Sequence, residues 1–152
     1  TYKTVNDNFN LYFQKLFGGG RAKLELIGEQ ILDSGFQVVA QPPGLKNTTV
    51  VNLSGGQKAL TGIALVFALF KLNPAPFCIM DEVDAPLSEG NVDIFCDIVK
   101  TMSESTQIIL VTHQKLTMEM TDQLIGVTSA EKGVSRIVEV NLQDVEKVEV
   151  TN

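Results

Sequence analysis

Two acidic residues and a histidine stand directly after two short apolar runs of the chain. Asp81 and Glu82 follow residues 77–80, and His113, the only histidine, follows residues 107–112. This grouping suits nucleotide hydrolysis, because Asp81 can hold Mg²⁺, directly or through water, and Glu82 can orient and deprotonate an attacking water. The imidazole can touch the γ-phosphate as charge develops there. Taken alone, each of these residues is better explained by a polar loop that begins after a strand.

A second feature directed at phosphate lies upstream, where Ser54, Gly55, Gly56 and Gln57 precede a long apolar segment. The serine is suited to cap a helix. The two glycines expose backbone N–H groups, and the helix dipole adds positive potential at the same place, so the site favours a phosphate oxygen. The alternative is a tight turn that only lets backbone segments pack closely. The order and spacing make the combination specific, since the serine precedes Asp81 by 27 positions.

A complete ATP site also needs a phosphate-binding loop of the form GxxxxGK[S/T]. The printed sequence contains none, and its nearest candidate, residues 18–23 (GGGRAK), lacks the second glycine before the lysine and the following Ser or Thr. The chain is therefore expected to carry half of a catalytic site.

A strand–helix–strand unit must bring these groups together. Apolar patterns predict strands at residues 77–80 and 107–112, the first covered on both faces, and a helix at about residues 89–103. Such a crossover makes the two strands parallel, and ligands bind beyond the carboxyl ends of parallel strands. The two carboxylates and the histidine are thus expected on one sheet edge.

The helix expected at about residues 55–72 is apolar nearly all round, which predicts central burial. The other expected elements are a helix at residues 1–17, strands at 22–27 and 36–41, a loop at 42–44, a short helix around 116–124, and strands at 124–128 and 134–142. Residues 143–152 give no clear prediction.

Composition limits the class of protein. The chain has 152 residues, of which 44% are hydrophobic and 20% charged, so one domain or a piece of one can bury a core. The net charge of −6 argues against a stand-alone nucleic-acid binder. The longest apolar run, residues 63–70, is far shorter than a membrane span, and no signal-peptide pattern opens the chain. Cys78 and Cys96 are expected as buried free thiols, and the location as cytoplasmic.

The combined motifs resemble the ABC-type ATPases. Residues 53–57 (LSGGQ) are similar to the signature motif, residues 77–82 (FCIMDE) to the Walker B strand, and His113 to the switch histidine. A split head is typical of the structural maintenance of chromosomes (SMC) family, and residues 9–142 look like the C-terminal end of a bacterial member. The shared segments are FGGGRA at 17–22, PPG at 42–44, LSGGQKAL at 53–60, PFCIMDEVDA at 76–85, VTH at 111–113 and GVT at 126–128.

The resemblance implies an α/β fold, namely the C-terminal half of an ABC-type (P-loop NTPase-like) head with a mostly parallel sheet, flanking helices and a few antiparallel strands. Residues 1–17 would form the helix at the base of a coiled coil, and residues 18–152 the C-terminal lobe of the head. ATP and Mg²⁺ are the implied cofactors, with Mg²⁺ supported by Asp81 through water. Glu82 would be the general base, and His113 would approach the γ-phosphate.

The signature residues would act in trans on ATP held by an opposing head. The implied partners are the N-terminal lobe of the same protein, a second head in a homodimer, a kleisin subunit near residues 134–142 and the tail, and DNA through the full-length protein, with no membrane. The assembled head would be an ATPase associated with the nucleoid, and the isolated chain would be inactive.

The segment that resembles the D-loop departs from the family pattern. It comprises Asp84, Ala85, Pro86, Leu87 and Ser88, in which the proline replaces an alanine and the serine replaces an aspartate. Proline stiffens the loop. Serine can still cap the following helix but supplies no carboxylate for communication between heads. Coupling between heads is therefore expected to differ, and ATP turnover to be slow.

Two other functions fit parts of the pattern. The first is a truncated nucleotide-binding domain of an ABC transporter, although such a domain normally carries a helical subdomain before LSGGQ. The second is a nonenzymatic interaction module that kept the fold, for example to bind a kleisin. The departures at Pro86 and Ser88 favour this module, whereas the intact Glu82 and His113 oppose it.

Overall fold

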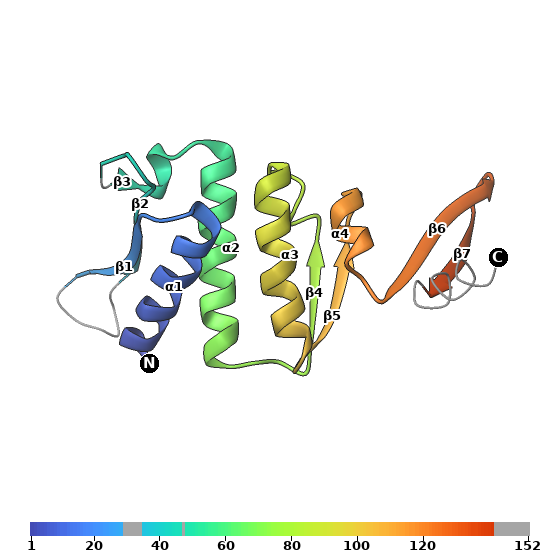
Figure 1. Cartoon of the computed structure of the whole chain (residues 1–152), viewed down its shortest axis with the longest axis horizontal. Helices are drawn as coiled ribbons and strands as arrows, with labels where there is room; N and C mark the ends of the chain where they lie inside the picture. The colour runs from blue at the N-terminus through green and yellow to red at the C-terminus, as the bar shows by residue number, and fades with distance from the viewer. Residues whose placement is uncertain (29–34, 47, 142–152) are drawn as a thin grey trace, which may run out of the picture.

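The computed structural model describes residues 1–28, 35–46 and 48–141. In order along the described chain the elements are α1 (Tyr2–Phe17), β1 (Arg21–Ile27), β2 (Gly35–Gln41), β3 (Thr48–Thr49), a 3-10 turn (Val50–Asn52), α2 (Gly55–Leu72), β4 (Phe77–Asp81), α3 (Glu89–Ser103), β5 (Gln107–Val111), α4 (Lys115–Glu119), β6 (Gln123–Glu131) and β7 (Val134–Asn141). They form an elongated row, with the β1–β2–β3 sheet beside α1 at one end and the β6–β7 hairpin at the other (Figure 1). The predicted order of helices and strands is confirmed, except that α4 ends earlier than expected and β6 runs longer.

The core lies where α1, α2 and α3 meet, and aromatic rings fill it. Tyr12 on α1 packs edge-on against Phe67 of α2 at 5.7 Å between ring centroids, and Phe67 stacks on Phe95 of α3 at 6.0 Å. These rings lie on the three helices that the sequence pattern predicted at residues 1–17, 55–72 and 89–103. Burial raises the pKa of the Tyr12 phenol, because a phenolate would lose its hydration there.

A stripe of polar side chains on α1 closes the free edge of β1. Tyr2, Asn6, Asn10 and Gln14 recur every four residues, so they share one face of the helix. The tyrosine hydroxyl donates to the carbonyl of Leu24, and Asn6 both accepts from its N–H at 2.6 Å and donates to its carbonyl at 3.3 Å. Asn10 accepts from the N–H of residue 22 at 3.0 Å, and Gln14 donates to the carbonyl of residue 20 at 3.1 Å. The side chains of α1 thus bind the backbone N–H and C=O groups on the edge of β1 that has no neighbouring strand among the described elements.

The glycine run that follows α1 has a structural role. Gly18 ends the helix in the left-handed conformation, with φ +69°. Gly20 has φ +82°, and a Cβ atom there would lie 2.2 Å from the carbonyl oxygen of Gln41. Only glycine fits both requirements, so the run serves the close approach of α1 to the β1–β2 pair.

The β4–β5 pair has the predicted parallel register, with Ile79 opposite Ile109 and Asp81 opposite Val111. The prediction that β4 is covered on both faces, however, is wrong for the part of the chain that the structure describes. Phe77 and Ile79 are 59% and 61% exposed, and Ile109 and Val111 lie on the same face about half exposed. The opposite face packs against α3, because its residues alternate with the exposed ones along each strand.

The predicted central burial of α2 is confirmed for only one face of the helix. Ile63, Ala64, Phe67 and Ala68 are buried, whereas Val66 and its neighbours one turn apart form an exposed stripe. The helix is long and apolar enough to cross a membrane by length and composition. Its packing against α1 is that of a core helix in contact with other protein segments.

The predicted α/β class is confirmed, while parallel pairing is more restricted than expected. Within the described residues only β4 and β5 run parallel; β1–β2, β2–β3 and β6–β7 are antiparallel hairpin-type pairs. Short connections allow antiparallel neighbours, whereas a parallel pair needs a crossover such as α3. Residue 142 and the unassigned segment 143–152 lie outside the described residues.

Candidate active site

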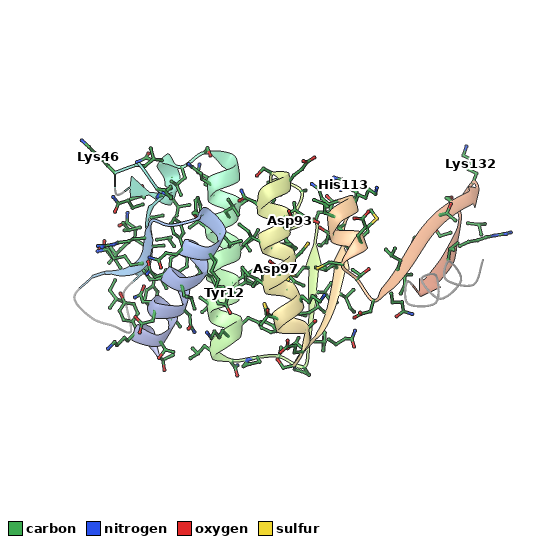
Figure 2. All side chains as sticks on the ribbon, viewed as in Figure 1. Tyr12, Lys46, Asp93, Asp97, His113 and Lys132 are labelled. Carbon is green, nitrogen blue, oxygen red and sulfur yellow. The ribbon has the colours of Figure 1, made fainter. Side chains whose placement is uncertain are left out.

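Glu82 and His113 meet at the carboxyl ends of β4 and β5. The imidazole Nδ1 lies 3.8 Å from a carboxylate oxygen of Glu82, and both side chains are more than half exposed. Figure 2 shows His113 beside the start of α4, at the end of β5. The prediction that these groups share one sheet edge is confirmed, because parallel strands end on the same side.

The backbone at Glu82 is unusual. Its φ is +49°, the only positive value for a non-glycine residue in the described chain. A side chain in this left-handed region costs conformational energy, and such residues gather at functional sites. The N–H of Glu82 donates to the carbonyl of Val111 at 2.8 Å, which extends the β4–β5 pairing by one bond. The backbone that carries the carboxylate is therefore fixed beside the end of β5.

Asp81 is the last residue of β4, and its side chain is exposed. In the described part of the chain no three His, Cys, Asp or Glu side chains come together as a metal site. A single exposed carboxylate nevertheless fits Mg²⁺, which is commonly bound through one or two carboxylates while phosphates and water complete its octahedron. Asp81 is thus the residue that would hold Mg²⁺, once a nucleotide supplies the other ligands.

The start of α2 has the predicted cap. Ser54 accepts from the N–H of Gln57 at 3.3 Å, and the Gln57 side chain accepts from the N–H of Ser54 at 3.1 Å. This reciprocal capping box satisfies two donors of the helix end and leaves Gly55 exposed, where a Cβ atom would meet nothing within 4 Å. A Cβ atom on Gly56 would lie 3.6 Å from the carbonyl oxygen of Pro86, so the signature-like segment borders the D-loop-like one.

The segment after Glu82 is a tight turn with an interior carboxylate. The N–H of Ala85 donates to the carbonyl of Glu82, and that of Leu87 to the carbonyl of Asp84. Asp84 and Leu87 are buried, while Ala85 and Pro86 are exposed.

The prediction that Ser88 caps the next helix is wrong for its side chain. Ser88 occupies the N-cap position of α3, but its hydroxyl makes no capping hydrogen bond. The first backbone bonds of α3 instead run from the N–H groups of residues 91 and 92 to the Ser88 carbonyl.

Sequence reasoning missed the threonines that bind Asp84. The hydroxyl of Thr112 donates to Asp84 Oδ2 at 2.6 Å, and the buried Thr117 on α4 donates to the same oxygen. The only sequence signal was the position of Thr112 directly before His113. The pairing joins residues 28 and 33 positions apart, which no local pattern can reveal.

Cys96 on α3 lies next to this cluster. Burial raises the pKa of its thiol; a hydrogen bond with Thr117 opposes the shift, and the nearby carboxylates of Asp84, Asp93 and Asp97 add to it. The thiol therefore stays protonated and unreactive near neutral pH. Both cysteines are free as predicted, but Cys78 is only partly buried.

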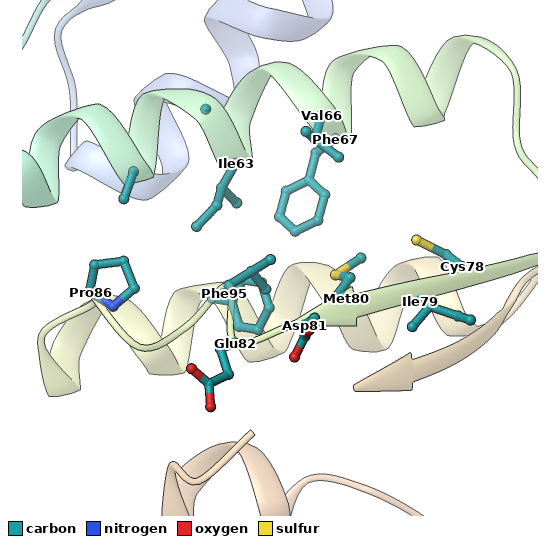
Figure 3. Close-up of a pocket in the computed structure, with 13 residues that line it drawn as sticks. Ile63, Val66, Phe67, Cys78, Ile79, Met80, Asp81, Glu82, Pro86 and Phe95 are labelled. Atoms are coloured by element: carbon teal, nitrogen blue, oxygen red, sulfur yellow. The ribbon is translucent and has the colours of Figure 1, made fainter. Parts of the chain in front are cut away.

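An apolar groove of about 420 Å³ lies between α2 and β4. Ile63, Val66 and Phe67 line the helix side, and Ile79 and Met80 line the strand side. In Figure 3 the carboxylates of Asp81 and Glu82 point away from α2, between Pro86 on one side and Ile79 on the other. The groove continues the exposed apolar surface of the β4 strand toward the carboxylates.

Comparison with known proteins places these features in a family. Residues 8–136 match the family model described as RecF/RecN/SMC N terminal domain. The chain is 59% identical over 144 residues to the chromosome partition protein Smc of Thauera aminoaromatica, and 57% identical over 144 residues to that of Coxiella burnetii. Each alignment covers 95% of this chain and 12% of the relative, so the chain spans about an eighth of the curated proteins that it matches.

Solved structures of SMC heads superpose on this chain. An Smc head domain of Pyrococcus furiosus with an extended coiled coil, bound to the C-terminal domain of ScpA, superposes with a TM-score of 0.90 at 37% identity over 99% of this chain and 38% of that one. A chain from a structural study of ATP-driven dimerization and DNA-stimulated activation of SMC ATPases gives 0.82 at 36% identity, over 99% of this chain and 93% of that one. An Smc head bound to the C-terminal winged-helix domain of ScpA gives 0.86 at 38% identity, over 96% and 45%.

Proposed function

The chain belongs to the RecF/RecN/SMC N-terminal domain family and is part of an SMC head, and we propose that it is the C-terminal lobe of an ATP-hydrolysing head that acts in chromosome segregation. The observation that carries the proposal is the meeting of Glu82 and His113 at the ends of two parallel strands. The curated relatives and solved structures described above are SMC proteins or heads, so the transporter alternative is set aside.

Three residues divide the chemistry of the proposed site. Mg²⁺, when bound with ATP, would neutralise charge on the phosphates, and Asp81 would hold it through water. Glu82 orients the attacking water and takes its proton, as a general base does. His113, which follows the neighbouring strand β5, hydrogen-bonds the γ-phosphate. The 3.8 Å separation between these last two side chains puts both within reach of one phosphate group.

The start of α2 contributes to a different ATP molecule, which the opposing head holds. Ser54, Gly55 and Gly56 are exposed, and their helix start offers N–H groups and the positive end of a dipole to a γ-phosphate. Because Gly56 borders Pro86, a head that approaches α2 also meets the D-loop-like turn. Head engagement would then depend on the triphosphate, since its last phosphate joins both surfaces.

A second lobe is needed to cover the open surfaces of the sheet. The exposed face of β4–β5 and the groove along α2 present apolar side chains that a folded protein normally buries. The N-terminal lobe of the same protein, with the phosphate-binding loop absent from this sequence, is the proposed occupant. In the same arrangement α1 is the base of the coiled coil, and DNA is bound by the full-length protein in the nucleoid.

Co-expression with the N-terminal end of the same gene product tests the proposal. We expect the isolated chain to show no ATP turnover above background, because it has no phosphate-binding loop, and the purified pair to hydrolyse ATP slowly. Turnover is measured by phosphate release, and nucleotide affinity by titration calorimetry. Robust hydrolysis by the isolated chain would contradict the half-site, and a pair that binds no ATP would favour a nonenzymatic interaction module.

The β6–β7 hairpin is the proposed docking site for a kleisin. Val127 and Ile137 lie opposite each other on one face, and both are more than two-thirds exposed. Figure 2 places Lys132 at the tip of the hairpin, remote from His113, so a partner there leaves the catalytic edge open.

Val127→Asp and Ile137→Asp are expected to weaken binding of a ScpA-type C-terminal winged-helix domain to the assembled head by at least about tenfold each, because a buried interface disfavours an unpaired carboxylate. Thr128→Asp adds the same charge to the other face of the hairpin and serves as the matched control. Binding is measured by calorimetry or interferometry. Equal losses in all three variants would show that general negative charge, rather than this face, is responsible.

A further inference from the structure

A buried carboxylate connects the two segments that carry Glu82 and His113. Asp84 is 1% exposed, and its Oδ2 accepts hydrogen bonds from Thr112, at 2.6 Å, and from Thr117. Thr112 directly follows β5, and Thr117 lies on α4 and is fully buried. Asp84 itself belongs to the turn that begins at Glu82.

The hydroxyl of Thr112 makes a second bond that shapes the backbone around the histidine. It accepts from the N–H of Gln114 at 3.0 Å, so the residues on both sides of His113 are tied to one oxygen atom. On the other segment, the N–H of Glu82 is bound to Val111 at 2.8 Å. Residues 82–85 and 111–114 therefore form one hydrogen-bonded unit, with the Asp84 carboxylate and the Thr112 hydroxyl at its centre.

We propose that Asp84 and Thr112 are positioning residues for His113, holding its backbone at a set distance from Glu82; the inference rests on the proposed ATPase function. The imidazole is largely exposed, so its direction depends on the backbone that carries it. The bond from Thr112 to the buried Asp84 side chain is short, at 2.6 Å, and is shielded from water, which restricts the motion of that backbone. Small displacements of a catalytic group lower the rate steeply, which makes such a support consequential.

Thr112→Val is the test, carried out in the head assembled from both lobes. The change keeps the branched shape but removes both bonds of the hydroxyl. We expect kcat for ATP hydrolysis to fall about tenfold while KM for ATP changes by less than about twofold, because the phosphate-binding loop is untouched. Thr112→Ser keeps the hydroxyl and should restore kcat to within about threefold of the unmodified head.

Thr117→Val is the matched control, since it removes a buried hydroxyl that donates to the same carboxylate oxygen but makes no bond to the backbone next to His113 in the described structure. Both valine variants should lower the melting temperature, whereas only Thr112→Val should lower kcat. Equal losses of kcat in the two variants would overturn the proposal and show a purely structural role. Unchanged kcat in Thr112→Val would also overturn it.

The unmodified head separates this inference from the proposed function. If the unmodified pair hydrolyses no ATP, the ATPase assignment fails and takes the positioning role with it. If it hydrolyses ATP and Glu82→Gln stops turnover while Thr112→Val does not slow it, only the positioning role fails.

Discussion

Replacing Glu82 by glutamine is expected to lower ATP turnover of the assembled head by about two to three orders of magnitude. An amide keeps the size and most hydrogen bonds of the side chain but cannot take a proton from water, and general base catalysis contributes a factor of this order. Nucleotide binding should persist, since Asp81 and the partner lobe's phosphate-binding loop are unchanged. Engaged head dimers with trapped ATP should therefore accumulate, which gel filtration or ultracentrifugation can measure with and without ATP.

Glu119→Gln provides the control for this result. Glu119 is an exposed residue of α4 that pairs with Lys115 at 3.5 Å, four positions away on the same helix. The same chemical change there should leave turnover within about twofold, since surface ion pairs contribute little. A Glu82→Gln head with normal turnover would remove this residue as the base and would point to an acceptor elsewhere in the assembled site.

Ser54→Arg is expected to abolish ATP-dependent engagement of two heads while each head still binds ATP. The serine is exposed at the start of α2, where a second head would have to approach, so a long cationic side chain blocks that approach. We expect the dimer affinity to fall by about a hundredfold or more, or ~2.7 kcal/mol. The variant is best made in the Glu82→Gln background, where dimers persist, and measured by ultracentrifugation alongside nucleotide titration.

Two controls separate blocked engagement from damage to the fold. Ser54→Ala adds no bulk and keeps the backbone N–H groups at the start of α2, and loss of the cap costs about 1 kcal/mol of stability, so this variant should weaken dimers far less than Ser54→Arg does. Ser105→Arg adds the same bulk and charge in the turn after α3, away from the α2 start, and should dimerise normally. If Ser54→Arg heads engage as well as these controls, the trans role of the signature segment is wrong.

The structure shows where the two residues that depart from the D-loop pattern lie. Pro86 places its carbonyl next to Gly56, and Ser88 leaves its hydroxyl out of the α3 cap. Both residues are exposed, and Pro86 lies beside the start of α2, where we propose that an opposing head engages. The expectation of altered coupling between heads stays a prediction, and it concerns the engagement surface rather than the Glu82–His113 edge.

The sequence by itself determined the features that depend on neighbours a few positions apart. The Ser54 cap of α2 agrees with the prediction, as do the bounds of α2 and α3, because a capping box and helical periodicity act within one or two turns. The Ser88 side-chain cap expected for α3 does not form. The parallel pairing of β4 and β5 was also predictable, since a helical crossover admits no other direction for neighbouring strands. That rule alone brought Glu82 and His113 to one edge.

Only the tertiary structure decided which apolar faces are covered and which polar groups are buried. Nothing near Asp84 in the sequence distinguishes it from the exposed Asp81, and its burial depends on Thr112 and Thr117, which lie about thirty positions away. Likewise, the apolar sequences of α2 and β4 do not indicate which face of each element packs against α1 or α3 and which face stays exposed. The hydrophobic effect is non-directional, so it favours burial of an apolar face but does not specify the segment that covers it. That segment depends on how distant parts of the chain pack together.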